Sequence, residues 1–167
     1  IMKTPNKLDP KIVSLLQTRL KFEYNHHYFY QSASNWCKNV GFKLAGSYFE
    51  NESTEELEHA RKLQQYLVDW NVTPIIPVAD MPKFEFKGLA DVIQSAYDTE
   101  YSVYTEYEDV SSKIFEMGDI CTFDFLSFFR NVQKEAVFAY SDMINLLEGS
   151  EINNKFQMLL LEEKLFE

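Results

Sequence analysis

The sequence predicts an all-α protein: a four-helix bundle with one long crossover and a short fifth helix at its C-terminal end. Five glycines and five prolines in 167 residues fall almost entirely between long segments that contain neither. Within those segments, apolar residues recur at the i, i+3, i+4 spacing of a buried helix face. Four such faces have to cover one another, which predicts a bundle.

The first two helices are expected at about residues 9–38 and 43–70, with Gly41 in the gap between them. Glycine is favoured just past the end of a helix. A connection of about four residues makes an antiparallel hairpin. Along the first helix the apolar face runs through Ile12, Leu15, Leu16, Leu20, Tyr24, Tyr28 and Ala33.

The third and fourth helices, at about residues 89–116 and 120–148, are expected to form a second hairpin around Gly118. The apolar face of the third runs through Leu89, Ile93, Ala96, Tyr97, Tyr101, Tyr104 and Val110. That of the fourth runs through Phe125, Phe128, Phe129, Val132, Ala136, Ala139, Met143, Ile144 and Leu147.

Residues 71–87 are expected to cross the full length of the bundle. Pro74, Pro77 and Pro82 lie here and exclude a helix interior. A helix of about 29 residues is about 43 Å long, and 17 extended residues reach about 56 Å. The third helix can therefore begin at the opposite end of the bundle.

A fifth helix is expected at about residues 151–165, completing one domain over 1–167. Apolar and polar residues alternate there as in an amphipathic helix. No apolar face of the four-helix bundle is left to cover it.

The chain is acidic, with 16 Lys+Arg against 26 Asp+Glu and a formal net charge of −10. This charge argues against a nucleic-acid partner and favours cations. No apolar run approaches the length of a membrane span, so no membrane partner is expected. Cys37 and Cys121 are too few for a disulfide framework, and no signal-peptide pattern is present, which together favour a cytoplasmic protein.

Glu56 and His59 form an ExxH pair in the second helix, where residues at i and i+3 share a face and can approach one metal ion. The first and third helices offer Glu23 and Glu100 on apolar, aromatic faces. A buried carboxylate must be paired, protonated or bound to metal. With Gln133 of the fourth helix, this set suits iron or manganese.

Glu23 and His26 form a second ExxH pair, and spacing alone does not dismiss His26 as a ligand. The fourth helix also carries Glu135 on an otherwise apolar face.

The linked motifs resemble the non-haem ferritins over essentially the whole chain. They are Glu23, Tyr30 and Trp36, then Glu55-Glu56-Leu57-Glu58-His59, then Tyr97-Asp98-Thr99-Glu100, and Gln133. The resemblance implies the ferritin-like bundle with one long crossover. It also implies a ferroxidase that oxidises Fe(II) with dioxygen or hydrogen peroxide.

By this resemblance, Glu23, Glu56 and His59 are ligands of a first iron ion. Glu56 and Glu100 are ligands of a second, so two iron ions bind per subunit. Gln133 stands at the polar position beside them.

The resemblance further implies that Tyr30 donates an electron or holds a ligand. His26 matches no ferritin ligand, and we interpret it as a partly exposed residue of the first helix.

Departures from the family pattern refine the class. Leu57 stands where the haem-binding bacterioferritins have methionine, and Ala136 removes their second ExxH, so no haem is expected. Bacterial ferritins often hold a third iron ion, whose acids are matched here only at Glu55 and Glu135. Val132 replaces one of the missing acids, and we expect this accessory site to be weak or absent.

The resemblance implies iron storage in a hollow homo-oligomeric shell of twenty-four subunits, with the fifth helix at the fourfold axis. Three alternatives remain: a shell subunit that does not oxidise iron, a DNA-protecting mini-ferritin, and another di-iron carboxylate protein such as a rubrerythrin. The retained acids argue against the first alternative. The fifth helix argues against the second, and the lack of rubredoxin-like cysteines against the third.

Overall fold

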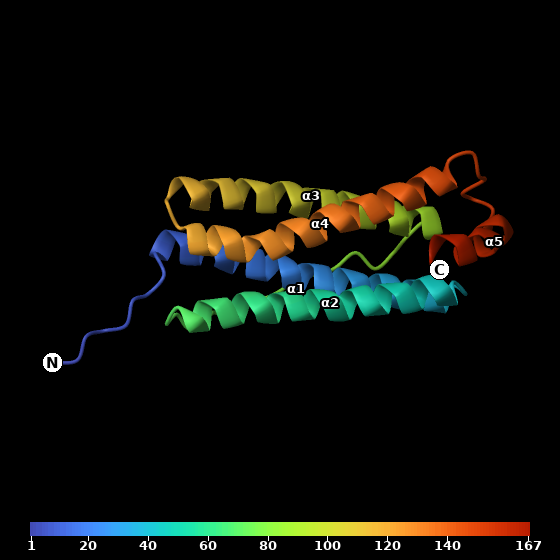
Figure 1. Ribbon diagram of the computed structural model, residues 1–167. Helices are drawn as coiled ribbons and strands as arrows, with labels where there is room; N and C mark the ends of the chain where they lie inside the picture. The colour runs from blue at the N-terminus through green and yellow to red at the C-terminus, as the bar shows by residue number, and fades with distance from the viewer.

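The computed structural model describes residues 1–167 and contains five helices and no strand. Figure 1 shows four long helices side by side and a short one across one end of the bundle. The predicted fold class is confirmed. The helices are α1 (Pro10–Asn39), α2 (Lys43–Asp69), α3 (Leu89–Glu116), α4 (Ile120–Leu147) and α5 (Lys155–Leu165).

α5 begins later than the predicted residue 151. Residues 151–154 form a turn, and the side chain of Asn154 caps the helix by accepting a hydrogen bond from the Gln157 backbone N–H at 3.0 Å. Asparagine is among the preferred N-cap residues because its side-chain oxygen satisfies a free N–H of the first turn.

The crossover between α2 and α3 lies along α1, and side chains of α1 satisfy its backbone. The amide of Gln17 both donates to the Ile75 carbonyl at 2.7 Å and accepts from its N–H at 2.9 Å. The amide of Asn25 accepts from the Asp80 backbone N–H at 2.8 Å and donates to the Asp80 carboxylate at 3.1 Å. These bonds replace the secondary structure that so long a loop lacks.

The turn between α3 and α4 combines a glycine with an N-cap. Gly118 has a φ of 80°, a conformation that favours glycine. Asp119 then accepts hydrogen bonds from both the backbone N–H and the hydroxyl of Thr122, at 3.0 and 2.6 Å.

Replacing Asp119 by alanine should lower the free energy of unfolding by about 1 kcal/mol, the usual effect of losing an N-cap. Asp119→Asn keeps the side-chain acceptor and serves as the matched control. Chemical denaturation followed by circular dichroism measures both. Equal stability of the alanine variant and the wild type would show that this cap is dispensable.

The interior consists of two apolar clusters with a polar layer between them. One cluster lies toward α5 and contains Phe49, Ile93 and Met143. The other lies toward the α3–α4 turn and contains Leu20 and Leu63. All four long helices contribute buried polar side chains to the layer between them: Glu23, Glu56, His59, Glu100 and Gln133.

The buried face of α3 differs from the predicted one. Tyr101 is 49% exposed, whereas Val103 and Tyr107 are buried beside Glu100. No helix in the chain has both the length and the hydropathy needed to cross a lipid bilayer.

Candidate metal centre

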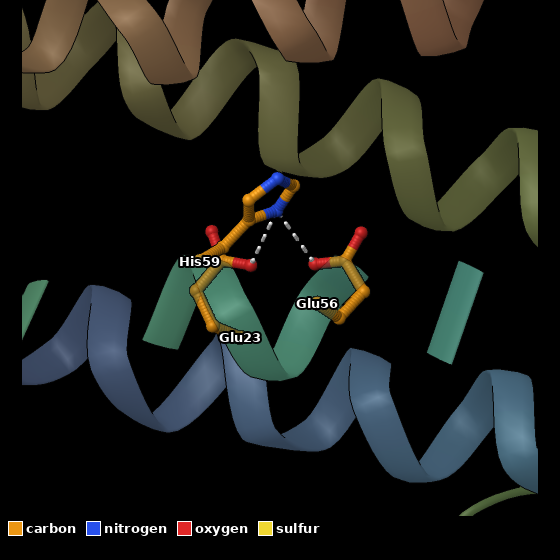
Figure 2. A group of neighbouring side chains, drawn as sticks. All are labelled: Glu23, Glu56 and His59. Atoms are coloured by element: carbon orange, nitrogen blue, oxygen red, sulfur yellow. Dashed lines mark ion pairs between the residues drawn. The ribbon is translucent and has the colours of Figure 1, made fainter. Parts of the chain in front are cut away.

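Three side chains of α1 and α2 place one potential ligand atom each within 4.8 Å of the others: Glu23, Glu56 and His59. Nδ1 of His59 lies 3.8 Å from Oε2 of Glu23 and 3.5 Å from Oε2 of Glu56 (Figure 2). These same three atoms are buried and make no hydrogen bond. Buried polar atoms normally have partners, so this arrangement suits a cation held between them.

Helix geometry explains how these residues meet. Glu56 and His59 are one turn apart on α2, so both face inward from the same side of the helix. α1 runs antiparallel to α2 and turns Glu23 toward them. In Figure 2 the imidazole of His59 points from α2 toward α3, across the interior of the bundle.

The charges of this group are strongly coupled. Burial alone would raise the pKa of Glu23, but its contacts with Glu56 and His59 lower it to about 2. Burial raises the pKa of Glu56 well above its usual value, and the negative charge of Glu23 adds to that shift. Burial would lower the pKa of His59, but contact with the Glu23 carboxylate raises it instead. The charges of the three side chains therefore depend on one another, and a cation between them competes with protons for Glu56 and His59.

Glu100 reaches the same layer from α3, and both of its carboxylate oxygens are held. Tyr30 of α1 donates its hydroxyl hydrogen bond to Oε1. The amide of Gln133 on α4 donates to Oε2 at 2.5 Å. Burial, followed by the negative charge of Glu100, raises the pKa of Tyr30 well above 10. Tyr30 is therefore a neutral phenol. It keeps the proton that it donates in its hydrogen bond to Glu100.

Glu23 has a corresponding partner that the sequence analysis missed. Tyr107 of α3 donates a hydrogen bond to Oε1 of Glu23 at 2.5 Å. A signal for it exists in the sequence, because Glu23 and Tyr30 have the same seven-residue separation as Glu100 and Tyr107.

A cleft of about 890 Å³ between α2 and α4 leads from the surface to this polar layer. Glu56, His59, Glu100 and Gln133 form its inner wall. Its rim carries the exposed carboxylates of Glu55, Glu58 and Glu135 and the half-buried Glu52, together with two exposed cations, Arg61 and Lys62. Small ions therefore have a route to the buried group, past a rim on which carboxylates outnumber cations.

The accessory acids lie where the cleft opens. Glu55 and Glu135 are exposed on its rim and make no ion pair. Glu52, one turn before Glu56, was not predicted. Burial and the charges of Glu55 and Glu100 raise its pKa to about 7.

His26 is buried, with 7% of its surface exposed, so the prediction of a partly exposed side chain was wrong. Its position explains this: it lies one turn after Glu23 and one turn before Tyr30 on the inward face of α1. It does not belong to the group formed by Glu23, Glu56 and His59.

Comparisons with known proteins agree with this architecture. Residues 13–150 match the family model of the ferritin-like domain. A probable bacterial non-heme ferritin-like protein of Haemophilus influenzae is 28% identical over 84% of this chain and 85% of its own length. The bacterial non-heme ferritin of Escherichia coli O6:H1 is 25% identical over the same shares.

Solved structures share the fold. An open-pore ferritin from the archaeon Archaeoglobus fulgidus superposes with a TM-score of 0.87, covering 95% of this chain and 97% of that one at 20% identity. A humanized archaeal ferritin gives the same TM-score and identity. With five helices in the same arrangement and a family match over most of its length, this chain belongs to the ferritin family, as a non-haem ferritin of bacterial type.

Proposed function

We propose that this protein stores iron and oxidises it on entry, with ferrous iron as the substrate of a buried two-metal centre. One observation carries the proposal. Glu23, Glu56 and His59 present three buried ligand atoms within 4.8 Å of one another, and none of the three is hydrogen-bonded. Oxygen and imidazole ligands in this combination suit ferrous and ferric ions.

The two iron ions bind in unequal sites. Glu23, Glu56 and His59 hold the first ion with atoms that have no competing partner. Glu56 and Glu100 hold the second, but Oε2 of Glu100 accepts a hydrogen bond from Gln133. The Gln133 amide competes for that oxygen, so we expect the second ion to bind more weakly than the first.

Oxidation then needs little from the protein beyond geometry and charge. Each ferrous ion loses one electron, and dioxygen takes up both electrons and two protons to become hydrogen peroxide. The carboxylates favour the ferric products because these carry the higher charge. Tyr30 keeps Glu100 in place throughout by its hydrogen bond.

The cleft between α2 and α4 serves as the route for iron. Its acidic rim attracts the cation, and Glu55 and Glu135 receive iron that leaves the centre. These exposed acids support transfer toward a mineral rather than a tight third site, since Val132 and Ala136 add no ligand to the cleft wall.

α5 supports assembly into a closed shell of twenty-four subunits. Phe156 and Leu160 are 71% and 63% exposed on this helix. Large apolar side chains exposed together are typical of protein interfaces.

Anaerobic titration with Fe²⁺ should show two ions bound per subunit, the first more tightly than the second. Admission of air should then oxidise the bound iron much faster than iron in protein-free buffer, in a particle of about half a megadalton by light scattering. A large particle that binds iron but oxidises it no faster than buffer would indicate a structural shell subunit instead. Failure to bind Fe²⁺ at all would refute the proposal.

A further inference from the structure

We infer that Tyr107 is a positioning residue of the metal centre: its hydroxyl holds one oxygen of Glu23 so that only the other oxygen faces the metal ion. This inference rests on the proposed function, because it requires a metal ion at Glu23. It concerns a contact that the ferritin resemblance did not imply.

The two oxygens of Glu23 have different surroundings. Oε1 accepts the hydrogen bond of Tyr107 at 2.5 Å. Oε2 makes no hydrogen bond and lies 3.8 Å from Nδ1 of His59. A carboxylate with one oxygen held by a phenol presents its other oxygen to a metal ion more readily.

Packing prevents the Tyr107 ring from turning away. The side chain is 1% exposed, and its ring stacks on Phe129 with centroids 5.2 Å apart and planes within 16°. The guanidinium of Arg19 lies 5.6 Å from the ring centroid and is itself buried and ion-paired with Glu106 at 2.5 Å. The phenol is therefore fixed by α1 and α4 as well as by its own helix.

The contact is one half of a reciprocal arrangement between α1 and α3. Each helix contributes a carboxylate and, seven residues later, a tyrosine. Tyr30 holds the carboxylate of α3, and Tyr107 holds the carboxylate of α1. Because the helices are antiparallel, the two pairs cross the interior in opposite directions.

The two carboxylate–tyrosine pairs differ in the surroundings of the second carboxylate oxygen. Gln133 occupies the second oxygen of Glu100, whereas the second oxygen of Glu23 is free. Tyr107 thus prepares Glu23 as a one-oxygen ligand. With one carboxylate oxygen fewer bound, a metal ion there would have room for the oxidant.

Tyr107→Phe removes only the hydroxyl and releases Oε1 of Glu23. We expect both oxygens then to bind the metal ion and fill the open position. At saturating Fe²⁺ the oxidation rate should fall about tenfold, the lower range for loss of a hydrogen bond to a metal ligand. The Fe²⁺ concentration for half-maximal rate should not rise, because no ligand is lost. A general loosening of the fold would raise that concentration as well.

The binding mode can be read directly with Co²⁺ under anaerobic conditions. At one equivalent, the visible absorption of Co²⁺ should be weaker in Tyr107→Phe, as expected for a higher coordination number. Tyr104→Phe is the matched control: this tyrosine lies one turn earlier on α3, is half-buried, and its hydroxyl makes no hydrogen bond. It should leave both the spectrum and the rate unchanged.

A folded Tyr107→Phe protein with the wild-type Co²⁺ spectrum and the wild-type saturating rate would overturn the inference alone. Absence of Co²⁺ and Fe²⁺ binding by the wild type would instead overturn the proposed function. If the variant does not fold, infrared spectra of the wild type loaded with Zn²⁺ decide. A wide separation between the two carboxylate stretching bands indicates binding through one oxygen and supports the inference. If all metal-bound carboxylates chelate through both oxygens, the inference is overturned.

Discussion

Replacing Glu56 and His59 together by alanine should reduce the rate of ferrous oxidation under air to nearly that of protein-free buffer. Glu56 is the only proposed ligand of both iron ions, and His59 the only imidazole among the ligands. Their removal takes away two of the three atoms that meet within 4.8 Å. Loss of several kcal/mol of metal affinity leaves no iron pair to oxidise, so a decrease of at least about 100-fold is expected.

The control is a double variant of similar size on another helix. Tyr101→Ala with Glu108→Ala removes one ring and one carboxylate that are both exposed on α3. It should oxidise iron at the wild-type rate. Stopped-flow absorbance of the ferric product measures all three proteins. If the Glu56–His59 variant keeps the full rate, the oxidation site lies elsewhere in the protein.

Much of the metal centre could be predicted from sequence because it depends on residues that lie close together along one helix. The pairing of Glu56 with His59 depends only on one helical turn. Glu23 and Glu100 stand out as carboxylates on apolar faces. The observed α2–α3 crossover follows from proline content and chain length alone.

The α3 face shows where such prediction failed. Tyr101 was assigned to the buried face because it continues the i+4 spacing from Tyr97. It follows Glu100 directly, however, and consecutive residues point about 100° apart on a helix. With Glu100 facing the centre, the inward positions one and two turns later are Val103 and Tyr107. Periodicity counted from the carboxylate would have found them.

Contacts between distant helices could not be predicted from periodicity. The hydrogen bond from Tyr107 to Glu23 depends on the position of α3 relative to α1 along the bundle axis. The crossover and the packing of Phe129 determine that position. The same holds for the bond from Gln133 to Glu100. His26 was a simpler error, since its spacing from Glu23 and Tyr30 already placed it on the buried face.

Metal binding should weaken steeply with acidity, because the centre holds protons that the metal ion must displace. Burial and the charge of Glu23 raise the pKa of Glu56 well above its usual value. The pKa of His59 is also raised above 6.5: burial opposes the shift, but contact with Glu23 outweighs it. A raised pKa extends the range of pH over which each of the two groups keeps its proton. Glu23, with a pKa of about 2, has no proton to lose at neutral pH.

Each proton released on binding changes the affinity about tenfold per pH unit. Between pH 7 and pH 6, the affinity for the first Co²⁺ ion should therefore fall about 10- to 100-fold, for one or two protons. Calorimetry in two buffers of different ionisation enthalpy counts those protons directly. His59→Ala should release fewer protons than the wild type at equal pH, since one of the two carriers is gone. Binding without proton release, and with constant affinity across this range, would mean that Glu56 and His59 are already deprotonated in the free protein.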